Sequence, residues 1–247
     1  MVHLGPLPGS PHFEDLDSVL RGAVRDARVL EEAGFDALCV ENYGDAPFSA
    51  TSVPPSTVAG MTRAISSVLD ACPLPVGINV LRNDATSALA IAAACSAAFI
   101  RVNVLTGSMF TDQGIISGQA AEVARARSAV APNTEVYADV FVKHAVPPPG
   151  VTFEDAAADT WTRGGADALI VSGPGTGEPA DLALVRAARK VAPDAPLLVG
   201  SGVTAQTVSE VLAEADGVIV GTSIKEEGVT SAPVSLRRAA ALVKAAS

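Results

Sequence analysis

Short apolar runs, each followed by a loop and a segment with helical signals, recur eight times along the chain. Continuous apolar runs of this length are typical of strands that are buried on both faces. Their strict alternation with helical segments predicts parallel strands joined by crossover helices. The eight runs are Val2–Leu4, Ala37–Val40, Val76–Val80, Phe99–Leu105, Val136–Val142, Ala168–Val171, Leu197–Val199 and Val218–Val220.

Eight strand–helix units in 247 residues predict an α/β fold, a single (β/α)8 TIM barrel domain over residues 1–247. The competing architecture is an open parallel sheet, but no G-x-G-x-x-G follows the first run. The segments Gly34–Val40 and Gly165–Val171 share the pattern G-x-D-A-L-x-V and lie four units apart. That relation is expected of two half-barrels, although the pattern is generic enough to leave an ancestral duplication open.

Local signals predict where several helices begin and end. The first helix is expected over Asp15–Ala33, with Gly34 as the residue that ends it. Asn83 or Asp84 is suited to cap the third helix, and a Thr followed three residues later by an Asp at 152–155 resembles a capping box for the fifth.

Polar residues alternate with apolar ones near the C-terminal ends of six runs. In a barrel the outward positions of a strand pack beneath helices and must be apolar. If Ile100, Val102 and Val104 face the helices, Arg101 and Asn103 point into the barrel. The same rule turns Ala138, Val140 and Val142 outward and predicts inward positions for His3, Glu41, Asn79, Asp139, Lys143 and Ser172.

This inward polar ring is the main functional signal in the sequence. A buried charge costs several kcal/mol unless it is paired, and a barrel shaped only for stability fills such positions with Val, Ile or Leu. The candidate catalytic residues are Asp139, Lys143, Glu41, Arg101 and His3, and the candidate substrate-binding residues are Asn79, Asn103, Asn42, Asp45 and Ser172. The competing interpretation is a self-satisfied buried ion network without chemistry.

Glycine-rich turns follow the seventh and eighth runs. In barrels the loops after these two strands commonly bind a phosphate through backbone amides. The predicted phosphate-binding residues are Gly200, Ser201 and Gly202 after the seventh run, Gly221, Thr222 and Ser223 after the eighth, and Gly175 and Thr176 in a third turn. The alternative is that these are simple tight turns.

Three loops are longer than is usual for a compact domain, namely Asn42–Pro55, Leu105–Ser117 and His144–Val151. Glycine hinges and aromatic residues suit two of them to act as lids over a ligand. An oligomer contact is an equal alternative, since Phe48, Met109 and Phe110 would form an exposed apolar patch.

The formal charge of −10 and the pI near 4.7 argue against binding to nucleic acid. Three cysteines at irregular spacing indicate reduced thiols and a cytoplasmic protein without a membrane span. A metal site formed by His3, Asp139 and His144 is not expected, because alternation turns His144 to the face opposite Asp139. Neither a metal nor a cofactor is therefore predicted.

Four segments together resemble the BtpA/SgcQ family nearly end to end: Val2–Pro11, Val40–Phe48, Asp139–Ala145 and Gly221–Lys225. The resemblance implies a TIM barrel akin to the ribulose-phosphate-binding barrels. It also implies two different roles, photosystem I biogenesis in cyanobacterial members and sugar- or nucleoside-related metabolism in others. It supplies no established set of catalytic residues.

Two functions then compete. The first is an isomerase or lyase acting on a phosphorylated sugar or ribose-linked metabolite, with its phosphate on the last two loops. Asp139 is expected to act as a base and Lys143 as an electrophile, rather than as a structural salt bridge, with Glu41 beside them. The second is a non-catalytic assembly factor of the photosystem I biogenesis type. A small phosphorylated substrate and a homo-oligomer are the expected partners.

Overall fold

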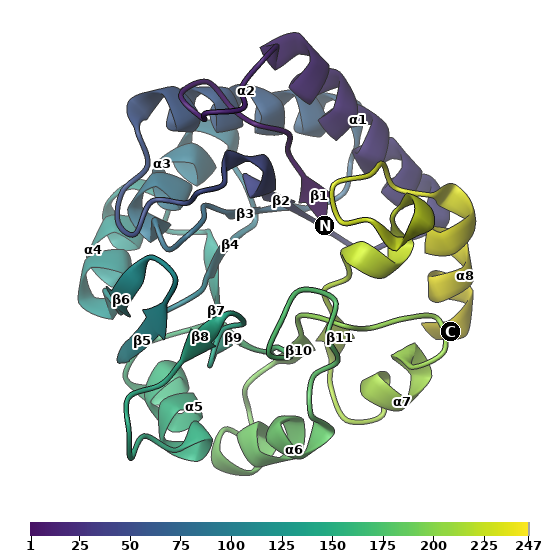
Figure 1. Cartoon of the computed structure of the whole chain (residues 1–247). Helices are drawn as coiled ribbons and strands as arrows, with labels where there is room; N and C mark the ends of the chain where they lie inside the picture. Colours follow the sequence, from purple (N-terminus) through teal and green to yellow (C-terminus); the bar gives the residue numbers. More distant parts are fainter. Residues whose placement is uncertain (247) are drawn as a thin grey trace.

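The computed structural model describes residues 1–246, in which eight parallel strands form a ring surrounded by helices (Figure 1). Neighbouring strands pair in the order β1-β2-β3-β4-β7-β9-β10-β11. Their bounds are β1 Val2–His3, β2 Leu38–Glu41, β3 Val76–Asn79, β4 Phe99–Val102, β7 Glu135–Val140, β9 Ala168–Val171, β10 Leu197–Val199 and β11 Gly217–Val218. Each predicted run overlaps one of these strands, and the TIM barrel prediction is confirmed.

The ring closes between its last and first strands. The nitrogen of Met1 donates a hydrogen bond to the carbonyl of Val220 at 2.8 Å. A side chain built at Gly221 would meet the His3 ring at 3.0 Å, so the segment after β11 lies directly against β1. The chain therefore forms a closed barrel, with residues 1–3 beside residues 220–221.

Within residues 1–246, eight α-helices surround the strands: α1 Leu16–Ala33, α2 Pro55–Ala71, α3 Ala85–Cys95, α4 Ala120–Val130, α5 Phe153–Thr162, α6 Leu182–Val191, α7 Val208–Leu212 and α8 Leu236–Ala246. The Asp15 carboxylate caps α1, which ends at Gly34 with a φ of 91° that favours glycine. Asp84 caps α3 and Thr152 caps α5. These helix boundaries agree with the sequence signals. Among the described residues, no helix is both long and apolar enough to cross a membrane.

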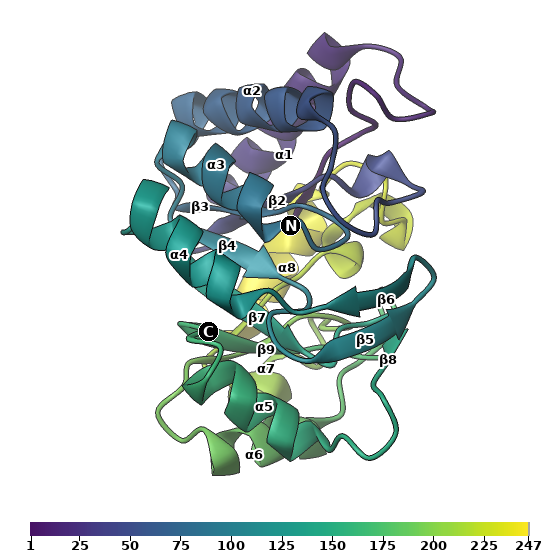
Figure 2. The same cartoon turned by 90° about the vertical axis from the view of Figure 1, so that its left-hand side faces the viewer.

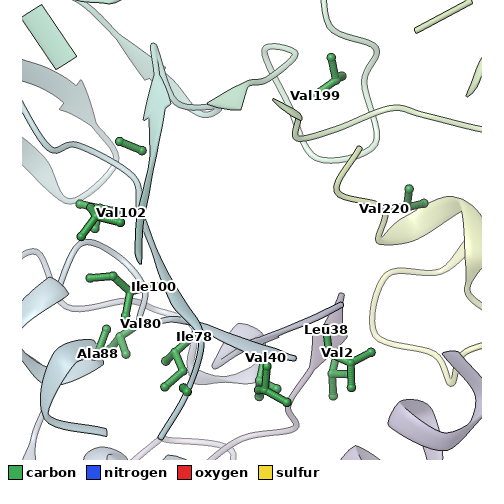
Figure 3. Close-up of a cluster of buried hydrophobic side chains, with 14 of the residues drawn as sticks. Val2, Leu38, Val40, Ile78, Val80, Ala88, Ile100, Val102, Val199 and Val220 are labelled. Atoms are coloured by element: carbon green, nitrogen blue, oxygen red, sulfur yellow. The ribbon is translucent and has the colours of Figure 1, made fainter. Parts of the chain in front are cut away.

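The outward side chains of the strands form the main core beneath the helices. Figure 3 shows Val40, Ile78, Ile100 and Val102 in one continuous apolar layer. The expectation that Val104 and Val142 join this layer is wrong. β4 ends at Val102 and β7 ends at Val140, so alternation does not hold two residues beyond those ends, where Val104 and Val142 lie.

Val104 and Val142 instead pack against a small antiparallel sheet that the sequence did not predict. Its strands are β5 Ser108–Thr111, β6 Gly114–Ser117 and β8 Ala145–Val146, in the order β6-β5-β8. Met109 and Ile116 on one face of this sheet are buried with the two valines. Figure 2 shows the sheet standing at one end of the barrel. Two of the three long loops are therefore paired with each other rather than separate.

The other face of this small sheet carries three exposed apolar side chains. Phe110 lies opposite Ile115 on β6 and opposite Val146 on β8, and the three are 45%, 63% and 65% exposed, respectively. The predicted patch of Phe48, Met109 and Phe110 is corrected accordingly. Met109 is buried and Phe48 is half-buried, so Phe110 alone remains of that set.

The inside of the barrel is apolar at the end where the strands begin. Met1, Cys39 and Phe99 are buried together there, with Tyr137 stacked on Phe99 at a ring distance of 4.5 Å. Gly77 makes room for Phe99, because a Cβ at this position would lie 2.0 Å from the ring. Burial raises the pKa of the Cys39 thiol to about 12, so this cysteine stays protonated and unreactive.

Outside the barrel, a buried ion pair joins α1 to the segment after β11. Lys225 is 1% exposed, and its Nζ donates to Asp26 Oδ2 at 2.9 Å. The backbone N–H of Val234 donates to the other carboxylate oxygen at 3.2 Å. This pair holds residues 225–234 against the first helix and leaves them above the C-terminal ends of the strands.

Candidate functional site

The inward polar residues surround one buried carboxylate. Arg101 Nε and Nη2 donate to the two oxygens of Asp139 at 2.9 and 2.8 Å, and both side chains are at most 1% exposed. Asn103 Nδ2 and Ser172 Oγ donate to the same carboxylate at 2.9 and 3.0 Å. The register argument therefore placed Arg101, Asn103, Asp139 and Ser172 correctly inside the barrel.

Four hydrogen bonds occupy the acceptor sites of Asp139, two on each oxygen. Burial alone would lower the pKa of Arg101, but the adjacent Asp139 raises it above the ordinary value. Arg101 thus stays charged and bound to its carboxylate. This geometry suits Asp139 to hold its three neighbours in place and gives little support to the idea that it removes a proton from a substrate.

A second carboxylate, Glu41, lies nearby without such partners. Its side chain is 3% exposed, and its Oε1 lies 3.8 Å from His3 Nε2, which is too long for a hydrogen bond. His3 Nδ1 lies 3.1 Å from the carbonyl of Thr230. Because a carbonyl can only accept, Nδ1 carries the proton and neutral His3 presents a free Nε2 beside Glu41. Burial, followed by the Lys225 ammonium, lowers the pKa of His3 well below its usual value.

Lys143 reaches the same region from the segment after β7. It lines a central cavity with His3 and Arg101, and its Nζ has no hydrogen-bond or ion-pair partner within residues 1–246. Burial lowers the pKa of Lys143, and the Glu41 carboxylate offsets only part of this shift. Asp139 cannot pair with this lysine because Arg101 already occupies it.

The cavity has a volume of about 290 Å³, and most of its other lining residues belong to turns of the chain. They come from three turns above the C-terminal ends of β9, β10 and β11. The backbone amides of Ser201, Gly202, Val203, Gly221, Thr222 and Ser223 have no hydrogen-bond partner in the described part of the chain. Six free N–H groups around one cavity are the arrangement that binds an anion.

Side-chain hydroxyls in these turns hold the turns to each other. Ser201 Oγ accepts from Gly173 N and donates to Glu178 O, at 2.7 and 3.0 Å. Thr222 Oγ1 lies 2.9 Å from Thr230 Oγ1, and Ser223 Oγ donates to Val203 O. The hydroxyls of Ser201, Thr222 and Ser223 are therefore engaged within the protein, and the backbone amides are the groups that remain free for an anion.

Thr176 and Gly175, the predicted phosphate-binding residues of the third turn, differ in their position relative to the cavity. Thr176 lines the cavity, and its backbone N–H donates to His144 Nε2 at 3.2 Å. Gly175 does not line it; a Cβ there would meet the Glu178 carboxylate at 2.6 Å. Gly175 is thus a close-packing position in the turn. His144 is exposed and tied to this turn, and residues 1–246 contain no cluster of three or more His, Cys, Asp or Glu side chains that could hold a metal ion.

None of the five predicted substrate-binding residues lines this cavity. Asn42 Oδ1 accepts from the backbone of Leu81 at 2.7 Å, and its Nδ2 donates to Asp45 at 3.1 Å. Asp45 accepts in turn from the backbone of Leu7. Both residues therefore join the loops after the first three strands. Asn79 donates to the Arg101 carbonyl at 3.1 Å, and its buried Oδ1 has no partner among the described atoms.

The sequence analysis missed two arginines. Arg238, near the start of α8, lines the cavity, and its Nη1 lies 3.4 Å from the Ser223 carbonyl. Arg82 is 4% exposed, donates to the Lys143 carbonyl at 2.6 Å and has a buried Nε without a described partner. Alternation could not place Arg82, because β3 ends at Asn79 and the chain turns there. Nothing in the local pattern distinguishes Arg238 from the exposed arginine before it.

The solved structures that this chain resembles share its barrel at low sequence identity. Phosphoribosyl anthranilate isomerase from Thermus thermophilus matches with a TM-score of 0.58 and 15% identity, over 90% of this chain and 92% of that one. The (S)-3-O-geranylgeranylglyceryl phosphate synthase from Thermoplasma acidophilum, solved with sn-glycerol-1-phosphate, gives 0.58 and 18%, over 91% and 87%. At these identities the similarity shows the fold alone.

Proteins of similar sequence cover nearly the whole chain. An uncharacterized protein of Thermococcus kodakarensis is 49% identical over all of this chain and 93% of its own length. The photosystem I biogenesis protein BtpA of Synechocystis is 42% identical, over 99% and 86%. The sgc region protein SgcQ of Escherichia coli is 31% identical, over 93% and 86%. The model of the BtpA family matches residues 1–247, and the chain belongs to that family.

Proposed function

We propose that this protein is an enzyme of isomerase or lyase type that acts on a small phosphorylated sugar or ribose-linked metabolite. One observation carries the proposal: a single cavity is lined both by residues with free backbone amides and by Lys143, Arg101 and His3. Its volume of about 290 Å³ lies at the lower limit of ligand pockets, which suits a small substrate.

The phosphate is proposed to bind at the amides that follow β10 and β11. Gly200 keeps this region open, because a Cβ there would lie 2.7 Å from Ser172 Oγ and 3.2 Å from Arg101 Nη2. Arg238 adds a positive charge at the same place, where a guanidinium hydrogen bond to a phosphate oxygen is stronger than a neutral one. The solved neighbours support this part, since two of them are named for phosphorylated compounds.

The chemistry is proposed to occur at Glu41 rather than at Asp139. Proton abstraction beside a carbonyl needs a carboxylate with a free oxygen, and Glu41 meets this condition whereas Asp139 does not. Arg101 and Lys143 then face the oxygen on which negative charge develops. In this assignment Asp139 is a positioning residue, because it acts by holding Arg101, Asn103 and Ser172.

Thermal unfolding with and without anions tests the phosphate assignment. A ligand at about 100 times its Kd stabilises by about 2.7 kcal/mol, which is about 5 to 11 °C for a protein of this size. We expect such a rise with inorganic phosphate and a larger one with dihydroxyacetone phosphate, but none with dihydroxyacetone. Arg238→Ala is expected to weaken phosphate binding by about 10- to 100-fold, since it removes a charged hydrogen bond of about 1.5–3 kcal/mol.

Arg237→Ala is the matched control, because Arg237 is exposed and lies outside the cavity. An equal response to phosphate in both variants and the unaltered protein would place the anion elsewhere and remove the basis for a phosphorylated substrate.

A second candidate is a non-catalytic role in the assembly of another protein. It is favoured by the name of the Synechocystis relative and by the exposed row of Phe110, Ile115 and Val146, for which the barrel itself gives no reason. A purely structural role does not require free polar groups inside the barrel. Retention of the biological role by a protein whose Glu41 and Lys143 are both replaced would favour assembly over catalysis.

A further inference from the structure

We propose that Lys143 is a covalent catalyst, whose side-chain amine forms an iminium ion with the aldehyde or ketone carbon of the phosphorylated substrate. This rests on the proposed function and extends it. There Lys143 supplies only a positive charge, whereas here its nitrogen attacks the substrate. The two roles require different properties of the side chain, and those properties can be separated by substitution.

The backbone on both sides of Lys143 is held in an unusual conformation. Phe141 and His144 have φ angles of 53° and 57°, in the left-handed region that side chains other than glycine rarely adopt. Such residues persist only where the surroundings fix them, and they concentrate at functional sites. Here Arg82 binds the Lys143 carbonyl at 2.6 Å, and the His144 N–H donates to the Pro174 carbonyl at 2.8 Å. The position of Lys143 is therefore set by the fold.

The amine itself is left without a partner. Of the two carboxylates inside the barrel, Asp139 is saturated by Arg101, Asn103 and Ser172, and Glu41 forms no ion pair with the lysine. Lysine that is buried away from a carboxylate loses its proton more easily than lysine in water. The lowered pKa of Lys143 agrees with this environment, in which Arg101 and Arg82 add repulsion. A nucleophilic amine needs this neutral form.

The neighbours of the lysine can move the protons that the reaction requires. Glu41 Oε1 lies 3.8 Å from the free Nε2 of His3, and His3 lines the cavity whereas Glu41 lies behind it. The Lys143 ammonium first gives one proton to this pair, and the neutral amine adds to the carbonyl carbon as the C=O π bond opens. The nitrogen then passes one of its protons to the former carbonyl oxygen, which becomes a hydroxyl. This hydroxyl takes up the proton held by the pair and leaves as water, while the nitrogen lone pair forms the C=N bond. Ammonium and carbonyl thus yield iminium and one water, with charge and atoms conserved.

The substrate class follows from the two kinds of group that line the cavity, free amides and the Lys143 amine. The phosphate lies on the amides after β10 and β11, and the carbonyl lies against Lys143, so the substrate is an open-chain aldose or ketose phosphate. The iminium ion withdraws electrons from the adjacent carbon more strongly than a neutral carbonyl does. Loss of a proton or breakage of a carbon–carbon bond at that carbon is then assisted, which are the steps of an isomerase and a lyase.

Borohydride trapping tests the covalent step. The protein is incubated with dihydroxyacetone phosphate or glyceraldehyde 3-phosphate, reduced with sodium borohydride and digested for peptide mass analysis. The expected result is a mass increase on the peptide with Lys143 equal to the sugar phosphate less one oxygen atom. Adduct formation should rise with pH and level off below the ordinary lysine pKa of 10.5. Exposed Lys190 and Lys244 serve as internal controls and should remain unmodified under the same conditions.

Two substitutions distinguish the nucleophile from a mere charge. Lys143→Arg keeps the positive charge and Lys143→Met removes it, while neither can form an iminium ion. We expect both to abolish the adduct and turnover, with Lys143→Arg still stabilised by inorganic phosphate. Glu41→Gln should keep the adduct site but slow its formation by about 100-fold or more.

The outcomes separate this inference from the proposed function. A thermal shift with the phosphorylated ketone or aldehyde but no adduct on Lys143, or activity retained in Lys143→Arg, overturns the covalent role and leaves the phosphosugar enzyme standing. No thermal shift with inorganic phosphate or either sugar phosphate overturns both.

Discussion

The two ends of the barrel interior are built by the same strands but are filled by opposite kinds of side chain. Where the strands begin, an apolar cluster is formed by Met1, Cys39 and Phe99. The lack of a side chain at Gly77 leaves room there for the Phe99 ring. Where the strands end, Arg101 and Asp139 are buried among amides and hydroxyls.

The difference separates stability from function. At the apolar end every group is satisfied by packing, and substitutions there should affect folding alone. At the polar end the ion pair of Arg101 and Asp139 is satisfied, but Glu41, Lys143 and the Oδ1 of Asn79 lack hydrogen-bond partners within residues 1–246. Buried polar groups that do not satisfy each other are costly, so their presence is expected where a ligand completes them.

The largest effect on stability is expected from Asp139→Asn. The change keeps the size of the side chain but leaves the Arg101 guanidinium buried without a carboxylate, which costs about 3–5 kcal/mol. The midpoint of thermal unfolding should fall by about 6 to 20 °C. This differs from the sequence-based interpretation, in which a substrate-facing Asp139 could be replaced with little loss of stability.

Asp159→Asn provides the control for that measurement. Its ion pair with Arg163 spans 3.8 Å between side chains that are 57% and 81% exposed, so the change should cost no more than about 0.5 kcal/mol. Equal destabilisation by both substitutions in urea unfolding would contradict the positioning role of Asp139.

An intermediate effect is expected at the apolar end from Gly77→Ala. The new methyl group would lie within 2.4 Å of three atoms of the Phe99 ring, so overpacking should cost about 1–3 kcal/mol. The rise in melting temperature expected on adding phosphate should stay unchanged, because the proposed phosphate site lies at the other end. The helix substitution Gly22→Ala, where the new Cβ is 3.9 Å from its nearest neighbour, should stabilise slightly. Loss of the phosphate response in Gly77→Ala would show that the two ends are coupled.

The smallest effect is expected from the pH dependence of stability at His3. The unfolded chain binds a proton at the ordinary pKa of 6.5, whereas the folded protein keeps His3 neutral to well below that value. Below pH 6.5 the unfolded state therefore binds more protons, and stability falls by at most about 1.4 kcal/mol per pH unit from this group. His3→Gln should remove that contribution, and His12→Gln, which changes an exposed histidine, should not. Unfolding titrations between pH 7 and 5 make the comparison; parallel profiles for His3→Gln and the unaltered protein would exclude a neutral buried His3.

The architecture was predictable from the sequence because strands that are buried on both faces consist of continuous apolar runs. Apolar runs marked all eight strands, and inward polar positions such as Arg101 and Asp139 followed from the two-residue period. Alternation predicts the direction of a side chain only within a strand and at the residue just after it. Val104 and Val142 continue the alternation in sequence, yet they pack on the small sheet because the chain has already turned.

Contacts across the barrel were not predictable from any single strand. Which carboxylate pairs with Arg101 depends on the stagger between strands, so Asp139 and Glu41 could not be ranked before the ring was assembled. Arg238 reaches the cavity from a helix that begins after a loop of irregular structure. The position of the amides of Gly202 and Gly221 beside one cavity was predictable. It follows from the glycine-rich turns after the last two strands and does not depend on side-chain orientation.

The hydrogen bond from His3 to Thr230 has a consequence for the order in which the protein acquires its site. It joins residues 227 positions apart, and the Asp26–Lys225 pair joins residues 199 positions apart. During synthesis, a chain that has formed its first seven strands still lacks Thr230, whose carbonyl oxygen fixes the proton on Nδ1 of His3. Contacts between such distant residues are slow to form, because a long loop must close before any energy is gained. The proposed site must therefore be completed abruptly, when the final segment docks, and a chain halted before residue 225 would have most of its barrel without the contacts that His3 and Asp26 make there.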